Sequence, residues 1–156
     1  MKYYLILFFA FSFIYYVFEA IFNRVSMGAI VETKLKKPKH SFWCYTSLWM
    51  LPFGGVIAVV FNLFLLIPIF NKIQFLPLLM LIGCIIITGV ELLGGLLLNK
   101  KLKLNIWDYS NSKIKIGSVT IPLNFKGQID IYHSILWAFM SLPILYFSKI
   151  IEWLAK

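Results

Sequence analysis

The stretch Phe75–Leu98, FLPLLMLIGCIIITGVELLGGLLL, contains a single charged side chain, that of Glu91. A helix needs about 20 predominantly apolar residues to cross the hydrocarbon core of a bilayer, and this stretch reaches that length. In lipid, every backbone polar group must be paired within the protein, which favours a helix over an isolated strand. The sequence therefore predicts a transmembrane helix over about 75–98.

Three further apolar stretches have the length of membrane spans: about 3–22, 42–70 and 129–151. The whole chain is 61% hydrophobic and 13% charged, whereas soluble domains are about half apolar and about a quarter charged. We therefore predict an all-α polytopic membrane protein in which 1–156 form one membrane domain with four transmembrane helices. The second span contains Pro52, the Gly54–Gly55 pair and Pro68, which predict a kinked or broken helix.

The basic residues are distributed unevenly between the predicted spans. Of the 15 Lys and Arg residues, eleven lie in the connections 23–41 and 99–128, and the other four are Lys2, Lys72, Lys149 and Lys156. Connections rich in Lys and Arg usually face the cytoplasm. We therefore predict a cell-membrane protein with both connections in the cytoplasm and both termini outside. This distribution also explains the net charge of +9 without a nucleic-acid partner.

The second basic connection has its own local pattern. In NSKIKIGSVTI, residues 111–121, lysines and aliphatic residues alternate on both sides of Gly117–Ser118. Alternation of this kind around a Gly-Ser pair is typical of a β-hairpin. We therefore predict a small hairpin in the third loop.

The two cysteines, Cys44 and Cys84, both lie within apolar stretches and lack metal-ligand spacing. We interpret both as buried packing residues, and we predict neither a metal site nor a cofactor. We also expect the pairs Gly54–Gly55 and Gly94–Gly95 to be packing contacts between helices.

Three of the predicted helices each carry a polar stripe with one carboxylate. Spacings of four, three and four residues keep the members of each stripe on one helix face: Ser12, Tyr16, Glu19 and Asn23; Cys84, Thr88, Glu91 and Gly95; Asp130, Ser134, Trp137 and Ser141. A charged side chain at the centre of a transmembrane helix costs about 2.5–3.5 kcal/mol or more, so each carboxylate is expected to have a partner or a function that offsets this cost. With the predicted orientation, all three lie in the cytoplasmic half of the membrane. We therefore predict an acidic, aromatic-rimmed binding cavity open to the cytoplasm, formed by Glu19, Glu91, Trp107, Asp108, Tyr109, Ser110, Asn124, Gln128, Asp130 and His133.

Structural roles are the alternative for each of these residues. Glu19 can pair with Arg24, and Glu91 can reach Lys100 or Lys101 near the interface. Trp107 and Tyr109 can serve as headgroup anchors, while Asp108 caps a turn. His133 can be a hydrogen-bonded packing residue rather than a ligand or a base.

The second half of the chain resembles a known family. GVELLGGLLLNKKLKLNIWDYS, followed by IPLNFKGQI and SILW, is similar to the signature of the bacterial ABC-transporter permease family of the CmpB-like type, sometimes called type IV. The matching residues are Glu91, Trp107, Asp108, Tyr109, Ser110, Pro122, Asn124, Gly127, Gln128, Ser134 and Trp137, with Tyr16, Glu19 and Pro52–Gly55 as looser matches. The chain departs from the pattern at Tyr15, where glycine is usual, and in the extra stretch between WDYS and Pro122. That stretch leaves open whether WDYS and the Asn124 turn close over the same space.

These observations lead to three functional hypotheses. The first is a small permease-like or partner-binding membrane component of an ABC-type transport system, which is not itself an enzyme. The sequence has no GxxxxGK[ST] loop, so transport would need a separate ATPase subunit or ion coupling through Glu19 and Glu91. Four helices enclose little space, so we expect a homo-oligomer or a heteromeric complex among membrane lipids. The alternatives are a membrane enzyme that uses Asp108, Asp130 or His133 on a lipid headgroup or a lipid-linked substrate, and a non-catalytic scaffold.

Overall fold

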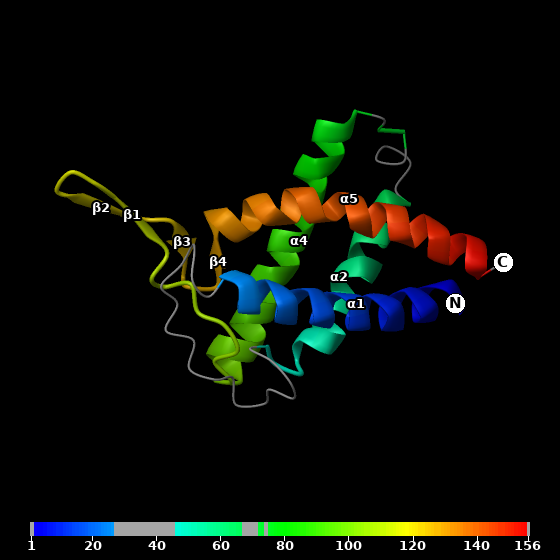
Figure 1. Cartoon of the computed structure of the whole chain (residues 1–156), viewed down its shortest axis with the longest axis horizontal. Helices are drawn as coiled ribbons and strands as arrows, with labels where there is room; N and C mark the ends of the chain where they lie inside the picture. The colour runs from blue at the N-terminus through cyan, green and yellow to red at the C-terminus, as the bar shows by residue number, and fades with distance from the viewer. Residues whose placement is uncertain (1, 27–45, 67–71, 74, 156) are drawn as a thin grey trace.

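The computed structural model describes residues 2–26, 46–66, 72–73 and 75–155, which are mostly helical. Figure 1 shows how the elements are arranged. In chain order they are α1 (Lys2–Ser26), α2 (Met50–Leu65), α4 (Leu76–Gly95), the π-helix η1 (Leu96–Lys101), β1 (Lys113–Ile116), β2 (Val119–Pro122), β3 (Asn124–Phe125), β4 (Ile129–Asp130) and α5 (Ile131–Leu154).

Three helical segments of the described chain are long and apolar enough to cross a membrane: Lys2–Phe22, Leu76–Lys101 and Ile131–Leu154. These correspond to the first, third and fourth predicted spans. The third predicted span continues past residue 98 because η1 extends α4 to Lys101, and the fourth begins as strand β4 before α5.

The second predicted span, 42–70, differs most from the structure. Its helix α2 has 16 residues and begins at Met50, after a turn in which the Met50 N–H donates to the Ser47 carbonyl at 2.9 Å. Pro52 lies in the first turn of α2, where backbone N–H groups have no intrahelical partners, so the proline is accommodated without breaking the helix. The predicted kink at Pro68 and the flanking residues 42–45 and 67–70 lie outside the described residues.

The helices pack as two main pairs, α1 with α2 and α4 with α5. Glycines bring the backbones together: Gly54 faces Tyr15 of α1, Gly55 faces Ser12, and Gly94 faces Phe53 of α2. A Cβ atom at any of these glycines would collide with its neighbour, so the predicted packing contact between helices is confirmed for Gly54, Gly55 and Gly94, whereas Gly95 lies against Gln128 of the connection before α5.

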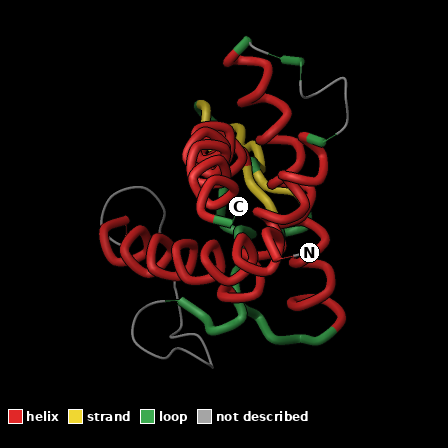
Figure 2. Tube along the Cα trace, turned by 90° about the vertical axis from the view of Figure 1, so that its right-hand side faces the viewer, coloured by secondary structure: helices red, strands yellow, loops and turns green. Residues whose placement is uncertain are grey.

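In Figure 1, α4 crosses the long helices α1 and α5 steeply, and Figure 2 shows the two chain termini close together at one end. Where α4 meets α5, the Cys84 thiol donates to the Ser134 carbonyl at 3.0 Å, so Cys84 lies between these helices, although it is half-buried rather than buried as predicted. Cys44 lies outside the described residues.

Two groups of buried side chains form the core. The larger group surrounds the crossing of α2, α4 and α5 and comprises Met50, Phe53, Ile57, Ile87, Leu98, Ile106, Trp107 and Trp137. The smaller group joins α1, α2 and the end of α5 and comprises Leu7, Phe11, Ala58 and Ile151.

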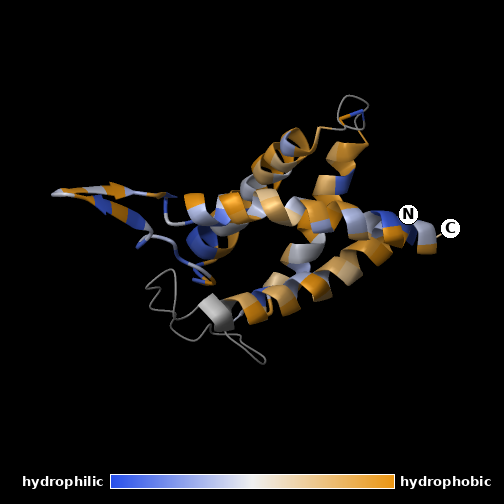
Figure 3. Ribbon diagram, turned by 45° about the horizontal axis from the view of Figure 1, so that its top comes forward, coloured by the Kyte–Doolittle hydropathy of each residue, from blue (hydrophilic) through white to orange (hydrophobic). Residues whose placement is uncertain are grey.

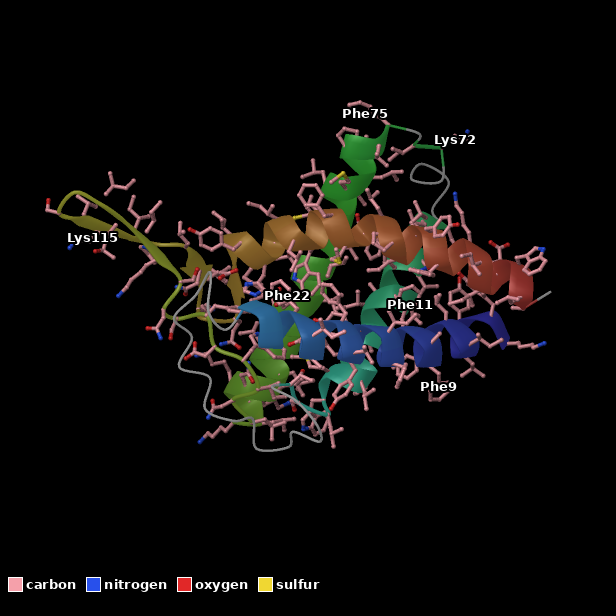
Figure 4. The ribbon with its side chains drawn as sticks, in the orientation of Figure 1. Phe9, Phe11, Phe22, Lys72, Phe75 and Lys115 are labelled. Atoms are coloured by element: carbon pink, nitrogen blue, oxygen red, sulfur yellow. The ribbon has the colours of Figure 1, made fainter. Side chains whose placement is uncertain are left out.

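Few side chains of the long helices are nevertheless fully buried. In the most apolar window of each membrane-length helix, only 22% of the residues are buried. Figure 4 shows the contrast on α1, where Phe9 points away from the helices with 67% exposure while Phe11 lies inside with 4%. Figure 3 shows the same apolar character along the helices, with hydrophilic residues gathered in the connection before α5. An outer surface of this kind fits a lipid environment better than water.

The connection between η1 and α5 contains two small antiparallel ladders. The predicted hairpin is confirmed: β1 pairs with β2, and Gly117 adopts the positive φ of 60° that glycine permits at the turn. A second ladder joins β3 to β4, and the sequence did not predict it. It places Gly127, with φ 71°, directly before Gln128 and the start of α5.

Candidate functional site

The candidate site centres on Glu91, in the last two turns of α4. The residue is 3% exposed, and both oxygens of its carboxylate accept hydrogen bonds. The Tyr109 hydroxyl donates to Oε1 at 2.9 Å, and the indole Nε1–H of Trp137 donates to Oε2 at 2.8 Å. The carboxylate thus connects α4 to α5 and to the WDYS turn.

This arrangement corrects two structural alternatives. In the described part of the chain, Glu91 forms no ion pair with Lys100 or Lys101, because its oxygens are occupied by neutral donors. Trp107 and Tyr109 are not headgroup anchors: Trp107 is 8% exposed in the core, and Tyr109 points its hydroxyl at Glu91. The carboxylate itself is covered, since Glu91 is 3% exposed and Tyr109 and Trp137 donate to its two oxygens, and the wider open cavity stays a prediction.

Asn99 in η1 holds the WDYS turn against the helices. Its Nδ2 donates to the Trp107 carbonyl and to Gln128 Oε1, each at 2.9 Å, and its Oδ1 accepts the Ile106 N–H at 2.7 Å. Asn99 is 6% exposed. Its side chain therefore takes the place of water as the hydrogen-bond partner of backbone groups in the chain after η1, which no longer have helical partners. Asn99 is a site residue that the sequence prediction does not include, and its position directly after an apolar span is the signal that indicates it.

Gln128 is the second side chain of this buried polar group, which we call the polar layer of Asn99 and Gln128. Its backbone carbonyl accepts the Trp107 Nε1–H at 2.9 Å, and its side-chain Nε2 donates to the Lys126 carbonyl at 3.2 Å. The side chain lies on Gly95, where a Cβ atom would come within 2.6 Å of Gln128 Oε1. A glycine at 95 is therefore required for Gln128 to reach Asn99.

The extra stretch between WDYS and Pro122 does not separate the two signature turns. The Tyr109 N–H donates to the Gly127 carbonyl at 2.9 Å, and Asn124 Nδ2 donates to the Ser112 carbonyl at 3.1 Å. Asn124 Oδ1 accepts the Gly127 N–H at 3.0 Å. The two turns therefore close over the same space, and the hairpin projects from their junction.

Asp108 and Ser110 lie on the outside of this structure. Both are exposed, and Asp108 accepts hydrogen bonds from the Ser110 N–H at 2.9 Å and from its hydroxyl at 3.0 Å. The capping alternative for Asp108 is confirmed, and its side chain does not contact Glu91 through any hydrogen bond of the described residues.

Asp130 and His133 stand beside the Glu91 group. Asp130 is the N-cap of α5: its Oδ1 accepts the His133 N–H at 2.8 Å and lies 2.7 Å from the ring Nδ1 of the same residue. Burial raises the pKa of Asp130, but the hydrogen bonds and charge of His133 outweigh it, so the pKa lies below its ordinary value. The His133 ring stacks on Tyr109 with ring centres 4.4 Å apart.

The first helix contributes Glu19 and Tyr15. The Tyr15 ring stacks on Trp137, with ring centres 5.8 Å apart. Burial, followed by the charges of Glu91 and then Glu19, holds the pKa of Tyr109 well above its ordinary value. Tyr109 therefore stays protonated and donates to Glu91, and both carboxylates lie close enough to act on its hydroxyl.

The structure thus sorts the predicted site residues into two groups. The inner group centres on Glu91. Tyr109 donates to its carboxylate, His133 stacks on Tyr109 and binds Asp130, and the charge of Glu19 acts on the Tyr109 hydroxyl. The others build the turns above it: Trp107, Asp108, Ser110, Asn124 and Gln128. Trp137 and Tyr15 belong to the inner group although the sequence prediction left them out. Among the described residues, no group of three or more His, Cys, Asp or Glu side chains could hold a metal ion.

No curated protein and no solved structure matches the chain. A match to one family covers residues 6–155, nearly the entire sequence. The chain belongs to the family described as "Putative ABC-transporter type IV".

Proposed function

We propose that this chain is a membrane-embedded, permease-like component of an ABC-type transport system, with Glu91 as the centre of its polar site. One observation carries the proposal. Glu91 is a buried carboxylate on a membrane-length helix, and its hydrogen bonds come from a second such helix and from the connection between them. Membership of the ABC-transporter family and the three membrane-length helices support it.

The energetic cost of this carboxylate argues for a role beyond stability. Removing a carboxylate from water costs several kcal/mol, and two neutral hydrogen bonds return only part of that cost. An apolar residue at position 91 could pack between α4 and α5 without this desolvation cost. Ionisable groups in membrane spans usually belong to ligand or proton pathways.

The hydrogen bonds of Glu91 suggest how the site could communicate with a partner. A cation or a proton that reached Glu91 would weaken its attraction for the Tyr109 hydroxyl. Tyr109 is fixed to Gly127 through its backbone N–H, so a shift of Tyr109 would be passed to the whole connection before α5. That connection carries Lys103, Lys113, Lys115 and Lys126, directly after Lys100 and Lys101 at the end of η1. We propose that it lies in the cytoplasm, where a separate ATPase subunit could contact it.

The small number of helices supports an assembly. Outward-facing apolar side chains cover α1 and α4, and the buried polar layer is filled by the chain's own residues. We therefore propose that the transport pathway forms between copies of this chain, or between it and another membrane subunit.

The test is co-purification from the native membrane in mild detergent, followed by an ATP-hydrolysis assay. We expect an ATPase subunit to co-purify, and we expect Glu91→Gln to uncouple its activity from the membrane component. Glu152→Gln, on the exposed end of α5, is the matched control. Absence of any ATPase from the purified complex would contradict the transport proposal.

A membrane enzyme is the second candidate, and the Asp130–His133 pair is the observation that favours it. A carboxylate 2.7 Å from Nδ1 orients the ring as in a general base, and the ring lies against Tyr109. Turnover of a co-purified lipid that is lost in His133→Gln, with the protein still folded, would favour the enzyme. Unchanged lipid in the wild-type protein would exclude this candidate.

A further inference from the structure

The β1–β2 hairpin has two chemically different faces. In its register, Ile114 lies opposite Ile121 and Ile116 opposite Val119. Directly opposed residues of an antiparallel pair share a face, and successive residues alternate between faces. One face is therefore entirely aliphatic, and the other carries Lys113, Lys115, Thr120 and Pro122.

Nothing in the described structure covers the aliphatic face. Its exposed fractions are 39% for Ile114, 60% for Ile116, 58% for Val119 and 42% for Ile121. In Figure 1 the hairpin projects from the end of the helices opposite the chain termini, and Figure 4 shows Lys115 on this projecting part. An isolated two-stranded hairpin is marginally stable in water, so a covering surface for these four side chains is expected.

The position of the hairpin in the chain indicates which surface covers its aliphatic face. The hairpin belongs to the connection between two membrane-length segments, Leu76–Lys101 and Ile131–Leu154, and α5 begins directly after β4. Both ends of this connection must therefore lie at the bilayer boundary. The base of the hairpin is closed by the hydrogen bond from the Leu123 N–H to the Ser112 carbonyl at 2.9 Å, and the Leu123 carbonyl accepts the Ile131 N–H at 3.0 Å, which joins this base to the start of α5.

The charge of the connection complements an anionic membrane surface. Between Leu102 and Asp130 the connection has four lysines and two carboxylates, Asp108 and Asp130, and Lys100 and Lys101 directly precede it. The Asp130 carboxylate is bound to His133, so the net charge of the exposed side chains in the connection is positive. Juxtamembrane lysines are attracted to anionic lipid headgroups, and aliphatic residues beside them enter the boundary of the acyl chains.

We infer that the β1–β2 hairpin is a lipid-binding element, which inserts its aliphatic face into an anionic bilayer surface while its lysines contact the headgroups. It thereby ties the turn that carries Tyr109 to the membrane surface. The inference rests on the membrane placement in the proposed function, but not on transport.

The test uses the full chain with Cys44→Ser and Cys84→Ser, and a single cysteine that carries an environment-sensitive fluorophore. Ile116→Cys and Val119→Cys report on the aliphatic face, and Lys115→Cys and Thr120→Cys on the polar face. The protein is placed in nanodiscs of phosphatidylcholine, with or without phosphatidylglycerol, that contain lipids with a nitroxide on the acyl chain. Phe9→Cys on the exposed side of α1 is the control for membrane placement.

We expect the nitroxide lipids to remove most of the emission from positions 116 and 119, and much less from 115 and 120. This difference should shrink in pure phosphatidylcholine and after Lys113→Gln together with Lys115→Gln. Free access of aqueous iodide to position 116, without quenching by the nitroxide lipids, would overturn the inference. Protection of position 116 from both quenchers would also overturn it and would indicate a protein surface. Failure of the lipids to quench position 9 would instead refute the membrane placement itself.

Discussion

The Tyr109 hydroxyl and the Glu91 carboxylate, 18 positions apart in sequence, meet at 2.9 Å in a partly buried hydrogen bond. This contact fastens the WDYS turn to α4. Tyr109→Phe removes the donor and leaves an oxygen of Glu91 without its partner, so we expect a loss of about 1–3 kcal/mol in the free energy of unfolding. Thermal unfolding in detergent measures it, and Tyr132→Phe, on the exposed side of α5, should change little.

Glu91→Gln tests whether the site requires two acceptors. The amide nitrogen of glutamine donates and cannot accept, so either Tyr109 or Trp137 would lose its acceptor. We expect destabilisation of about 1–3 kcal/mol and a shift in the tryptophan fluorescence. If Glu91→Gln and Tyr109→Phe were additive in the double variant, the two side chains would not interact as the structure indicates.

Glycine 95 provides a steric test of the polar layer. Gly95→Ala would place a methyl group against the Gln128 side chain, disturb the Gln128–Asn99 hydrogen bond, and cost about 1–3 kcal/mol. Gly89→Ala on the same helix meets nothing within 4 Å, and alanine is the better helix former by about 1 kcal/mol. Opposite signs for the two variants, compared by their melting temperatures, are the expected result.

Acid should destabilise the start of α5. The pKa of Asp130 lies below its ordinary value in the folded protein, so the ionised group stabilises the fold above about pH 4. That contribution is lost as the pH falls through the lowered folded-state pKa. Asp130→Asn keeps the N-cap acceptor but lacks the charge, so its melting temperature should be lower at neutral pH and should change less on acidification. Asp108→Asn, in the exposed turn, is the control; an equal change there would contradict this role for Asp130.

The hairpin should be dispensable for folding, provided that Ser112 remains. Its carbonyl accepts hydrogen bonds from Leu123 and Asn124, so a deletion of residues 111–121 would remove part of the site scaffold. Replacement of residues 114–121 by an Asn-Gly dipeptide keeps the base of the hairpin. We expect this variant to be monodisperse in detergent and to melt within a few degrees of wild type, and aggregation would show that the hairpin belongs to the core.

The topology prediction can be checked on the same scaffold. Lys113→Cys should resist a membrane-impermeant thiol reagent in intact cells, whereas Lys72→Cys, in the short connection between α2 and α4, should react. The reverse pattern would place the polar layer of Asn99 and Gln128 outside the cell.

The helices were predictable because each depends on local composition alone. Apolar length was sufficient to locate α1, α4 and α5, and the Gly117–Ser118 turn located the hairpin. The extent of α2 was not predictable, because an apolar stretch does not mark where a helix starts within it. The β3–β4 ladder has two residues in each strand, too few for alternation to be detected.

The candidate site was predictable as a set of residue types but not as a set of contacts. Helical spacing gave the faces of Glu19, Glu91 and Asp130, since spacing along one helix is a local property. The partners of Glu91 depend on how α4 and α5 cross, and the role of Asn99 depends on how the chain leaves η1. Both are tertiary properties, which explains why Trp137 and Asn99 were absent from the predicted site.

The π-helical turn of η1 determines the direction in which Asn99 and the chain after it face. There the Leu102 N–H reaches back to the Leu97 carbonyl, one residue further than in an α-helix. Each residue turns an α-helix by about 100°, so a chain one residue shorter across Leu96–Lys101 would carry Asn99 away from Gln128 by that angle. The number of residues between Glu91 and Asn99 is thus fixed. Deletion of one of the leucines 96–98 should destabilise the protein far more than substitution of the same leucine.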